Sequence, residues 1–397
     1  MNLADRAKNI SPSPTLSIDA KAKKLIAGGA DVVNFGVGEP DFDTPDHIKA
    51  AAIDAINRGM TKYTAVAGTD QIKEAIIKKF KDDNGLDYQP GQIVVSAGAK
   101  HSLYNAFQVL CQVGDEVILP APYWVSYLEQ IKLTGGTPII VQTRASNGFK
   151  LTPGELEGAI TPRTRMILIN SPSNPTGAVY TRSEMEALGE ILVRHNITII
   201  SDEIYEKLIY DGLEHVSIAA LSPELKELTV VINGVSKSYA MTGWRIGYAA
   251  APGPVAKAMA DLQSHSTSNP TSIAQAASVA ALSGTQGPLR EMVREFNRRR
   301  DYMLERVNGI QGLSCGCPGG AFYLFPDMGH YINCSYSGKR IEGASDLAAI
   351  LLDEANVALV PGIAFGDDRC FRLSYATSME KINEGLNRIE HLLARIK

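Results

Sequence analysis

The chain has 397 residues, of which 45% are hydrophobic, 21% charged and 7% aromatic. Its formal charge is −4, with 39 Lys and Arg against 43 Asp and Glu, so the composition lacks the basic excess that proteins binding nucleic acid or anionic lipid usually have. The length exceeds what one hydrophobic core commonly serves and predicts two unequal domains of a globular enzyme.

The first 45 residues contain several prolines, and we expect them to form an irregular arm that joins the smaller domain. The start of this arm, MNLADRAKNISPSP, lacks the apolar run of a secretory signal. No later segment offers the about 18 apolar residues that a membrane helix needs. We therefore predict a cytoplasmic protein without a membrane partner.

Short apolar runs alternate with helical stretches from residue 46 to 285, which is the pattern of an α/β domain built on a mostly parallel sheet. Helices are expected on both faces of that sheet; one is Thr69–Lys81, whose apolar residues recur at four-residue spacing. The predicted strands are Gln92–Ala97, Glu116–Leu119, Met166–Asn170, Ile197–Ser201, Thr229–Asn233 and Arg245–Ala250.

A long helix is predicted to begin after Gly287-Pro288, because apolar residues keep the helical period from Leu289 to Ile310. Glycine clusters follow, then strand-like runs at Phe322–Phe325 and Phe371–Tyr375, and a charged closing helix. Residues 286–397 are therefore predicted to form a smaller α+β domain.

Cysteine and histidine give no sign of a metal site. The seven histidines show no ligand spacing, and the five cysteines contain no C-x-x-C pair, which also argues against a disulfide framework. We expect free thiols and no bound metal.

Reactive side chains follow the predicted strands, at the edge where open parallel sheets bind ligands. Asn174 follows MILIN, Asp202 and Tyr205 follow ITIIS, and Lys237 follows TVVIN. After QIVVS, the turn that contains Ala99 and Lys100 opens a helix, and the amino end of a helix favours an anion such as phosphate. An amine, a carboxylate, a phenol and a phosphate site are the parts that pyridoxal 5′-phosphate (PLP) chemistry requires.

The chain resembles the class I, fold-type I aminotransferases, which depend on PLP. Five segments carry the resemblance in the family's order: KYTAVAG, SPSNPTG, SDEIY, SKSYAMTGWRIGY and FRLSYA. One such motif would be weak, but five in order are specific. The resemblance covers the chain from about Asn34 onward and implies a seven-stranded, mostly parallel sheet, a smaller α+β domain, and a homodimer. It points to the bacterial-type aspartate aminotransferase branch, which passes the amino group of aspartate to 2-oxoglutarate.

The resemblance also implies the roles of the cofactor residues. Lys237 matches the lysine that bonds the cofactor and later moves the proton, although a lone lysine could be a solvated surface residue. Asp202 matches the carboxylate that faces the pyridine nitrogen, although it could instead cap a helix. Tyr205 and Asn174 match the pair that binds the phenolic oxygen. Trp124 matches the ring that stacks on the cofactor, where a core tryptophan would be the simpler interpretation.

Phosphate and substrate residues follow from the same comparison. Arg245 matches the phosphate arginine, and Tyr63 matches a tyrosine that reaches the phosphate from the neighbouring subunit. Arg372 matches the arginine that binds the substrate α-carboxylate through two parallel hydrogen bonds, a bidentate geometry that lysine cannot supply. Gly38 matches a glycine whose backbone approaches that carboxylate.

One departure concerns the distal carboxylate of a dicarboxylic substrate. Animal and enteric aspartate aminotransferases bind it with a second arginine, but SHSTSNPTS contains none. A related branch uses a lysine at a helix start together with arm hydroxyls, and Lys100, Ser13 and Thr15 occupy those places. Some members of that branch accept prephenate and carry a basic residue where Ser11 stands, which argues against prephenate here.

Three other activities remain open at this point. The nearest is a class I aminotransferase that prefers aromatic amino acids, alanine or prephenate, and a PLP lyase on the same fold is next. A transcription regulator would need a DNA-binding module of some sixty residues ahead of the fold, where the sequence has only the short arm.

Overall fold

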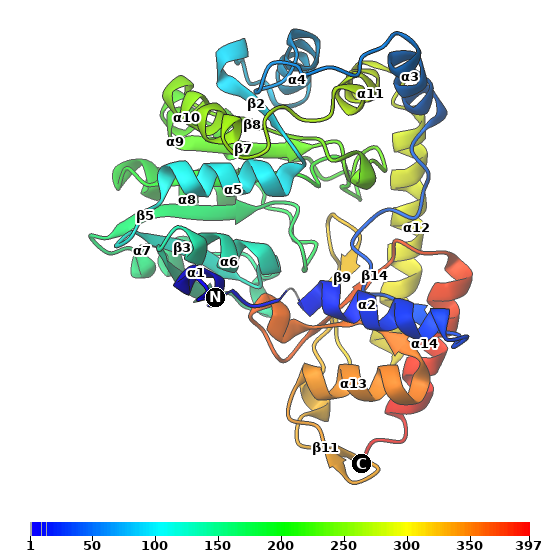
Figure 1. The fold of residues 1–397 in the computed structure, drawn as a ribbon. Coiled ribbons are helices and arrows are strands. Elements are labelled where there is room, and N and C mark those ends of the chain that lie inside the picture. The colour runs from blue at the N-terminus through cyan, green and yellow to red at the C-terminus, as the bar shows by residue number, and fades with distance from the viewer. Residues whose placement is uncertain (1, 9, 13) are drawn as a thin grey trace.

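The structure, a computed structural model, describes residues 2–8, 10–12 and 14–397, with the backbone only for residues 14–16 and 19. Figure 1 shows a large sheet covered by helices and, below it, a smaller group of helices and short strands. Helix α12 (Gly287–Gly309) runs along both parts and begins where Gly287-Pro288 predicted it. The domain boundaries 1–45, 46–285 and 286–397 stay a prediction.

The large sheet has seven strands in the order β2-β8-β7-β6-β5-β3-β4. Strand β8 is antiparallel to both of its neighbours, and the other neighbouring strands are parallel, which confirms the mostly parallel α/β fold. The strands are β2 (Ile93–Ser96), β3 (Glu116–Ala121), β4 (Thr137–Gln142), β5 (Thr164–Asn170), β6 (Thr198–Asp202), β7 (Thr229–Gly234) and β8 (Gly247–Ala250). Because β8 is reversed, its amino end lies beside the carboxyl ends of the others.

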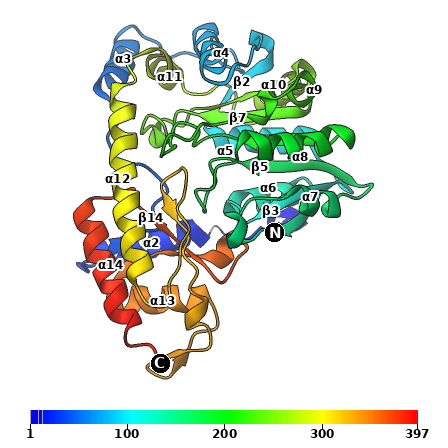
Figure 2. The same ribbon diagram turned by 180° about the vertical axis from the view of Figure 1, so that it is seen from behind.

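Alternate side chains of β5 enter two separate cores, which explains why MILIN is apolar throughout. Met166 and Leu168 share a core with α5 (Ala99–Leu110), α6 (Val125–Leu133) and α10 (Gly253–Ser264). Ile167 and Ile169 share the other core with α7 (Pro153–Ala159), α8 (Arg182–Arg194) and α9 (Pro223–Leu228). Burial of each such side chain contributes roughly 1.5–3 kcal/mol. In Figure 1 α5 and α6 lie in front of the sheet, whereas α7 and α8 lie in front in Figure 2.

Three helices pack at the β2 end of the sheet, at the top of Figure 1: α3 (Asp46–Asn57), α4 (Asp70–Asn84) and α11 (Ser272–Ser283). Helix α4 is the helix predicted over Thr69–Lys81. Thr69 is its N-cap, and its side chain accepts a hydrogen bond from the amide of Ile72 at 3.4 Å.

The smaller part is built on a three-stranded antiparallel sheet in the order β13-β14-β9. Its strands are β13 (Val360–Pro361), β14 (Phe371–Ser374) and β9 (Tyr323–Leu324). Helices α13 (Ala344–Ala355) and α14 (Met379–Leu393) and the hairpin of β10 (Ser335–Tyr336) and β11 (Lys339–Arg340) complete it. The two predicted strands are confirmed here, but both are shorter than expected.

The amino-terminal segment corrects one prediction. Besides the short α1 (Asp5–Lys8), it forms α2 (Pro14–Ala27) and β1 (Val33–Asn34), so it is not irregular throughout. Pro14 is the first residue of α2, a position at which proline fits a helix because no intrahelical hydrogen bond is lost. Strand β1 pairs with β12 (Val357–Ala358), which attaches this segment to the smaller part.

Two details of the large sheet also differ from expectation. Strand β4 was not among the predicted strands, because its sequence TPIIVQ is short, contains Pro138, and lies half-exposed at the sheet edge. Arg245 does not begin a strand; it has a φ of 56°, and β8 begins at Gly247.

None of the described helices combines the length and the hydrophobicity needed to cross a membrane.

Candidate functional site

The predicted cofactor residues meet at one edge of the large sheet. They lie at or just after the carboxyl ends of β2 (Ala99, Lys100), β3 (Trp124), β5 (Asn174), β6 (Asp202, Tyr205) and β7 (Lys237). Arg245 reaches the same edge from the amino end of the reversed strand β8. This arrangement places an amine, a carboxylate, a phenol and a guanidinium around one site.

Asp202, the last residue of β6, is 2% exposed. One carboxylate oxygen accepts a 2.7 Å hydrogen bond from the Tyr127 hydroxyl, and the other accepts from the amide of Ile204 at 3.2 Å. Burial raises the pKa of Asp202 to about 6 in spite of these two donors. The carboxylate is therefore mostly ionised at neutral pH, and it can pair with a positive charge that enters the site.

Lys237 follows β7, and its ammonium donates a 2.5 Å hydrogen bond to the backbone carbonyl of Gly38. Burial lowers the pKa of Lys237 to about 8, with nearby Arg372 and Arg245 acting in the same direction and Glu39 opposing them. A lysine with this pKa has a sizeable neutral fraction near pH 7.5, as a nucleophile or a base requires.

Arg372, on β14, is buried and lies beside Asn174. Its guanidinium donates to the side-chain oxygen of Asn174 and to the carbonyl of Gly36, both at 2.9 Å. Its Nε has no partner among the described atoms. Because no described carboxylate pairs with Arg372, its charge calls for an anion from outside the chain.

The amino end of α5 forms a cradle beside Arg245. Within the described chain, no hydrogen bond uses the amides of Ala99 and Lys100, and Gly98 offers no side-chain cap. A Cβ on Gly98 would come 2.3 Å from Arg245 Nη2, and a Cβ on Gly247 would come 2.0 Å from the Ala99 nitrogen. The two glycines let backbone and guanidinium approach closely, and together they can bind a phosphate.

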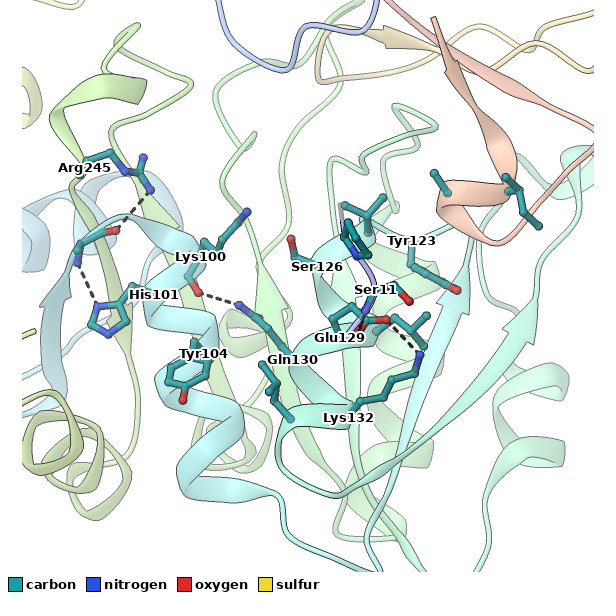
Figure 3. A pocket seen from close by; sticks show the side chains of 17 residues that line it. Ser11, Lys100, His101, Tyr104, Tyr123, Ser126, Glu129, Gln130, Lys132 and Arg245 are labelled. Atoms are coloured by element: carbon teal, nitrogen blue, oxygen red, sulfur yellow. Dashed lines mark hydrogen bonds and ion pairs between the residues drawn. The ribbon is translucent and has the colours of Figure 1, made fainter. Parts of the chain in front are cut away.

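Lys100 lies at a cavity of about 550 Å³ between α5 and α6, shown in Figure 3. Ser11 and Pro12 of the amino-terminal segment also line it. The Lys100 ammonium lies 4.9 Å from the centroid of the Trp124 ring. Partial burial lowers the pKa of Lys100, and the charge of Arg245 adds to the effect.

The structure does not test the roles predicted for Tyr63, Ser13 and Thr15. The Tyr63 side chain is 92% exposed. Ser13 lies outside the described residues, as does the side chain of Thr15, whose backbone belongs to α2.

Two site residues were not predicted from the sequence. Tyr127 donates to Asp202, and the Tyr323 hydroxyl lies 2.9 Å from that of Tyr205. The position of Tyr127, three residues after Trp124 in APYWVSY, was the available signal. Tyr323 lies inside the apolar run FYLF, which is typical of ordinary core.

A buried ion network lies next to Asp202 in the chain. Glu203 accepts from the hydroxyls of Ser201 at 2.8 Å and Ser217 at 2.7 Å, and it pairs with His215 at 2.9 Å. Glu206 and His215 have ligand atoms within 4.8 Å of Glu203. However, Lys79 already pairs with Glu206, so an ammonium supplies the positive charge there.

Comparison with known proteins identifies the family. Residues 30–389 match the family model described as aminotransferase class I and II. The chain is 55% identical to the aspartate aminotransferase of Geobacillus stearothermophilus over 393 residues, 99% of each chain. It is 50% identical to the aspartate/prephenate aminotransferase of Cereibacter sphaeroides over 394 residues, 99% of this chain and 98% of the other.

A solved structure agrees with these sequence relatives. The aspartate aminotransferase from Rhizobium meliloti superposes with a TM-score of 0.97 at 48% identity, covering 100% of both chains. Family match, sequence identity and fold all extend over nearly the full length. The chain belongs to the aminotransferase class I and II family and is a PLP-dependent transaminase.

Proposed function

We propose that this enzyme transfers the amino group of aspartate to 2-oxoglutarate, giving oxaloacetate and glutamate in two half-reactions. The observation that carries the proposal is a set of cations without carboxylate partners among the described residues: Lys100, Arg245 and Arg372. Three anions of the reaction match them in chemistry, namely the cofactor phosphate, the substrate α-carboxylate and the distal carboxylate.

The buried groups of this site fit PLP. When bound, PLP supplies an aldehyde that condenses with amines and a protonated ring that accepts electrons. Lys237 Nζ would bond the aldehyde carbon, and the Asp202 carboxylate would hold the proton on the ring nitrogen. Arg245 and the amides of Ala99 and Lys100 would bind the phosphate.

The remaining residues orient the reacting groups. Tyr205 and Asn174 would donate to the phenolic oxygen, and the Trp124 ring would stack on the cofactor. Once the substrate amine has displaced Lys237, its neutral Nζ would take the proton from the substrate α-carbon and return it on the cofactor side, which its lowered pKa supports.

Arg372 would bind the α-carboxylate together with the backbone of Gly38. Lys100 would bind the distal carboxylate, joined by hydroxyls of Ser13 and Thr15. Arg372 would therefore bind every amino acid substrate, whereas Lys100 would contact only dicarboxylic substrates.

We further propose a homodimer in which Tyr63 of each subunit reaches the phosphate site of the partner. The support is the high exposure of Tyr63 together with that of Ile53 and Ile56 on α3, which are 59% and 52% exposed. Exposed apolar side chains on neighbouring segments are typical of an interface.

A cytoplasmic location remains a prediction from the sequence.

Prephenate is a second candidate substrate, because the Cereibacter sphaeroides relative is among those named for both aspartate and prephenate. Ser11 at the cavity argues against it, since it offers no positive charge. Steady-state kinetics with aspartate, glutamate, alanine, aromatic amino acids and prephenate tests the proposal. A kcat/KM for aspartate below that for alanine or aromatic donors would overturn the aspartate preference.

A further inference from the structure

Tyr323 is completely buried on β9 and faces Arg372. In the β9–β14 pair, Tyr323 lies opposite Ser374. Alternate residues of a strand face the same side, so Arg372 shares the face of Ser374 and is a diagonal neighbour of Tyr323. The guanidinium carbon of Arg372 lies 4.3 Å from the centroid of the Tyr323 ring.

The hydroxyl of Tyr323 reaches the other side of the site. It lies 2.9 Å from the hydroxyl of Tyr205, which follows β6 in the large sheet. Burial raises the pKa of both phenols, so each keeps its proton at neutral pH. A phenol has one proton to donate. If Tyr205 donates it to the cofactor's phenolic oxygen, Tyr323 must be the donor in the pair.

A second aromatic ring lies against Arg372. Phe365, at the end of a 3₁₀ turn (Gly362–Phe365), lies 5.1 Å from the guanidinium carbon of Arg372. Planar guanidinium groups stack on aromatic rings, and such contacts limit the directions in which the side chain can turn. Phe365 has no hydroxyl. A change at Phe365 therefore removes a ring beside Arg372 without removing a hydrogen bond to Tyr205.

We propose that Tyr323 is a positioning residue with two roles: its hydroxyl orients and polarises Tyr205, and its ring holds Arg372 for the substrate α-carboxylate. The inference rests on the proposed function of Tyr205 and Arg372. A phenol that receives a hydrogen bond is a stronger donor, so Tyr323 strengthens the bond from Tyr205 to the cofactor. The same side chain thereby serves the cofactor and the substrate.

The test compares Tyr323→Phe, Tyr323→Leu and Phe365→Leu in the holoenzyme. The first readout is the pH titration of the visible absorbance of Lys237-bound cofactor without substrate. Tyr323→Phe should raise the pKa obtained from this titration by about half a unit, because the hydrogen bond from Tyr205 to the phenolic oxygen of the cofactor is weakened. Phe365→Leu should leave it unchanged.

The second readout is KM for aspartate. Phe365→Leu and Tyr323→Leu should each raise KM about 3- to 10-fold, because the guanidinium loses a stacking ring. Tyr323→Phe keeps the ring, so its KM should stay within about twofold of the unchanged enzyme.

Three results would overturn the proposal. An unchanged absorbance pKa in Tyr323→Phe removes the role of the hydroxyl, and an unchanged KM in Tyr323→Leu removes that of the ring. Equal changes of both readouts in Phe365→Leu and Tyr323→Phe would indicate general loosening of the site. The titration needs no substrate, and KM can be measured with any amino acid that turns over, so a failed aspartate assignment leaves this test intact.

Discussion

The ammonium of Lys237 donates a 2.5 Å hydrogen bond to the backbone carbonyl of Gly38, a residue 199 positions away. The bond joins the loop after β7 to the segment after β1, so the predicted cofactor lysine and a predicted substrate residue share one site. No described carboxylate pairs with Lys237, and burial lowers its pKa to about 8. The lysine is therefore available for covalent bonding.

Lys237→Ala should retain PLP without a covalent bond and lose turnover by at least about 10⁴-fold, because the anchor and the proton-transfer base are both removed. Absorbance spectra and single-turnover assays measure the two effects. Lys257→Ala is the matched control, since Lys257 lies on the surface and pairs with Asp261. Transamination by Lys237→Ala near the normal rate would contradict the site assignment.

Asp202→Asn should bind the cofactor but react about 10²- to 10⁴-fold more slowly with aspartate, since a neutral amide cannot hold the ring nitrogen protonated. Tyr127→Phe removes one hydrogen bond from Asp202 and should have a smaller effect, about 10-fold or less. Rapid-mixing measurements of the first half-reaction provide the rates. If Asp202→Asn reacts as fast as the unchanged enzyme, another group protonates the ring.

The sequence predicted the buried strands of the large sheet well, but it did not predict an edge strand or the first long helix. Strand β7 was placed almost to the residue, because TVVIN is buried on both faces and must be apolar throughout. Strand β4 was missed because an edge strand tolerates Pro138 and polar ends. Helix α2 was missed because Pro14 suggests a break, although proline is well placed at the start of a helix.

Residues that act through a neighbouring side chain could not be predicted from the sequence. Asp202 and Lys237 could be singled out because charged groups directly after buried strands are unusual. Tyr127 and Tyr323 carry no such signal, because a tyrosine in an apolar run usually belongs to the core. Their contacts to Asp202 and Tyr205 join segments 75 and 118 residues apart, which only the folded chain reveals.

A mixture of Tyr63→Ala and Lys237→Ala chains should recover activity if each site is shared between two subunits. Both changes then fall in one site of a mixed dimer, and the other site is intact. Equal mixing and free exchange should give about one quarter of the unchanged activity, well above Tyr63→Ala alone. Recovery would be absent if Tyr63 served the site of its own subunit, because neither site of a mixed dimer would then be complete.

The His215–Glu203 pair should make stability depend on pH. Burial and the charge of Lys79 disfavour the charged form of His215, but Glu203 and Glu206 outweigh them and raise its pKa above 6.5. The folded state then binds the proton more tightly than the unfolded state. The stabilisation is thus fully present below about pH 6.5 and is lost as the pH rises through the raised pKa. It amounts to about 1.4 kcal/mol for each pH unit that separates the folded-state pKa from the unfolded-state pKa.

The comparison with His215→Gln isolates this contribution, because glutamine can donate to Glu203 without carrying a charge. Unfolding free energies of the two holoenzymes, measured from about pH 5.5 to 9, should converge as the pH rises. A stability difference that stays constant across this range would show that His215 does not change its charge there.

Lys100→Ala should lower kcat/KM for aspartate and glutamate about 10- to 100-fold, the loss of one charge-assisted hydrogen bond of about 1.5–3 kcal/mol. Alanine and aromatic donors should be nearly unaffected, because they have no distal carboxylate and the variant leaves the proposed α-carboxylate site at Arg372 unchanged. Lys132→Ala is the matched control: Lys132 lines the same cavity but pairs with Glu129 at 3.1 Å. An equal fall across all substrates would instead assign the Lys100 side chain to the cofactor phosphate, which we propose binds at the start of α5.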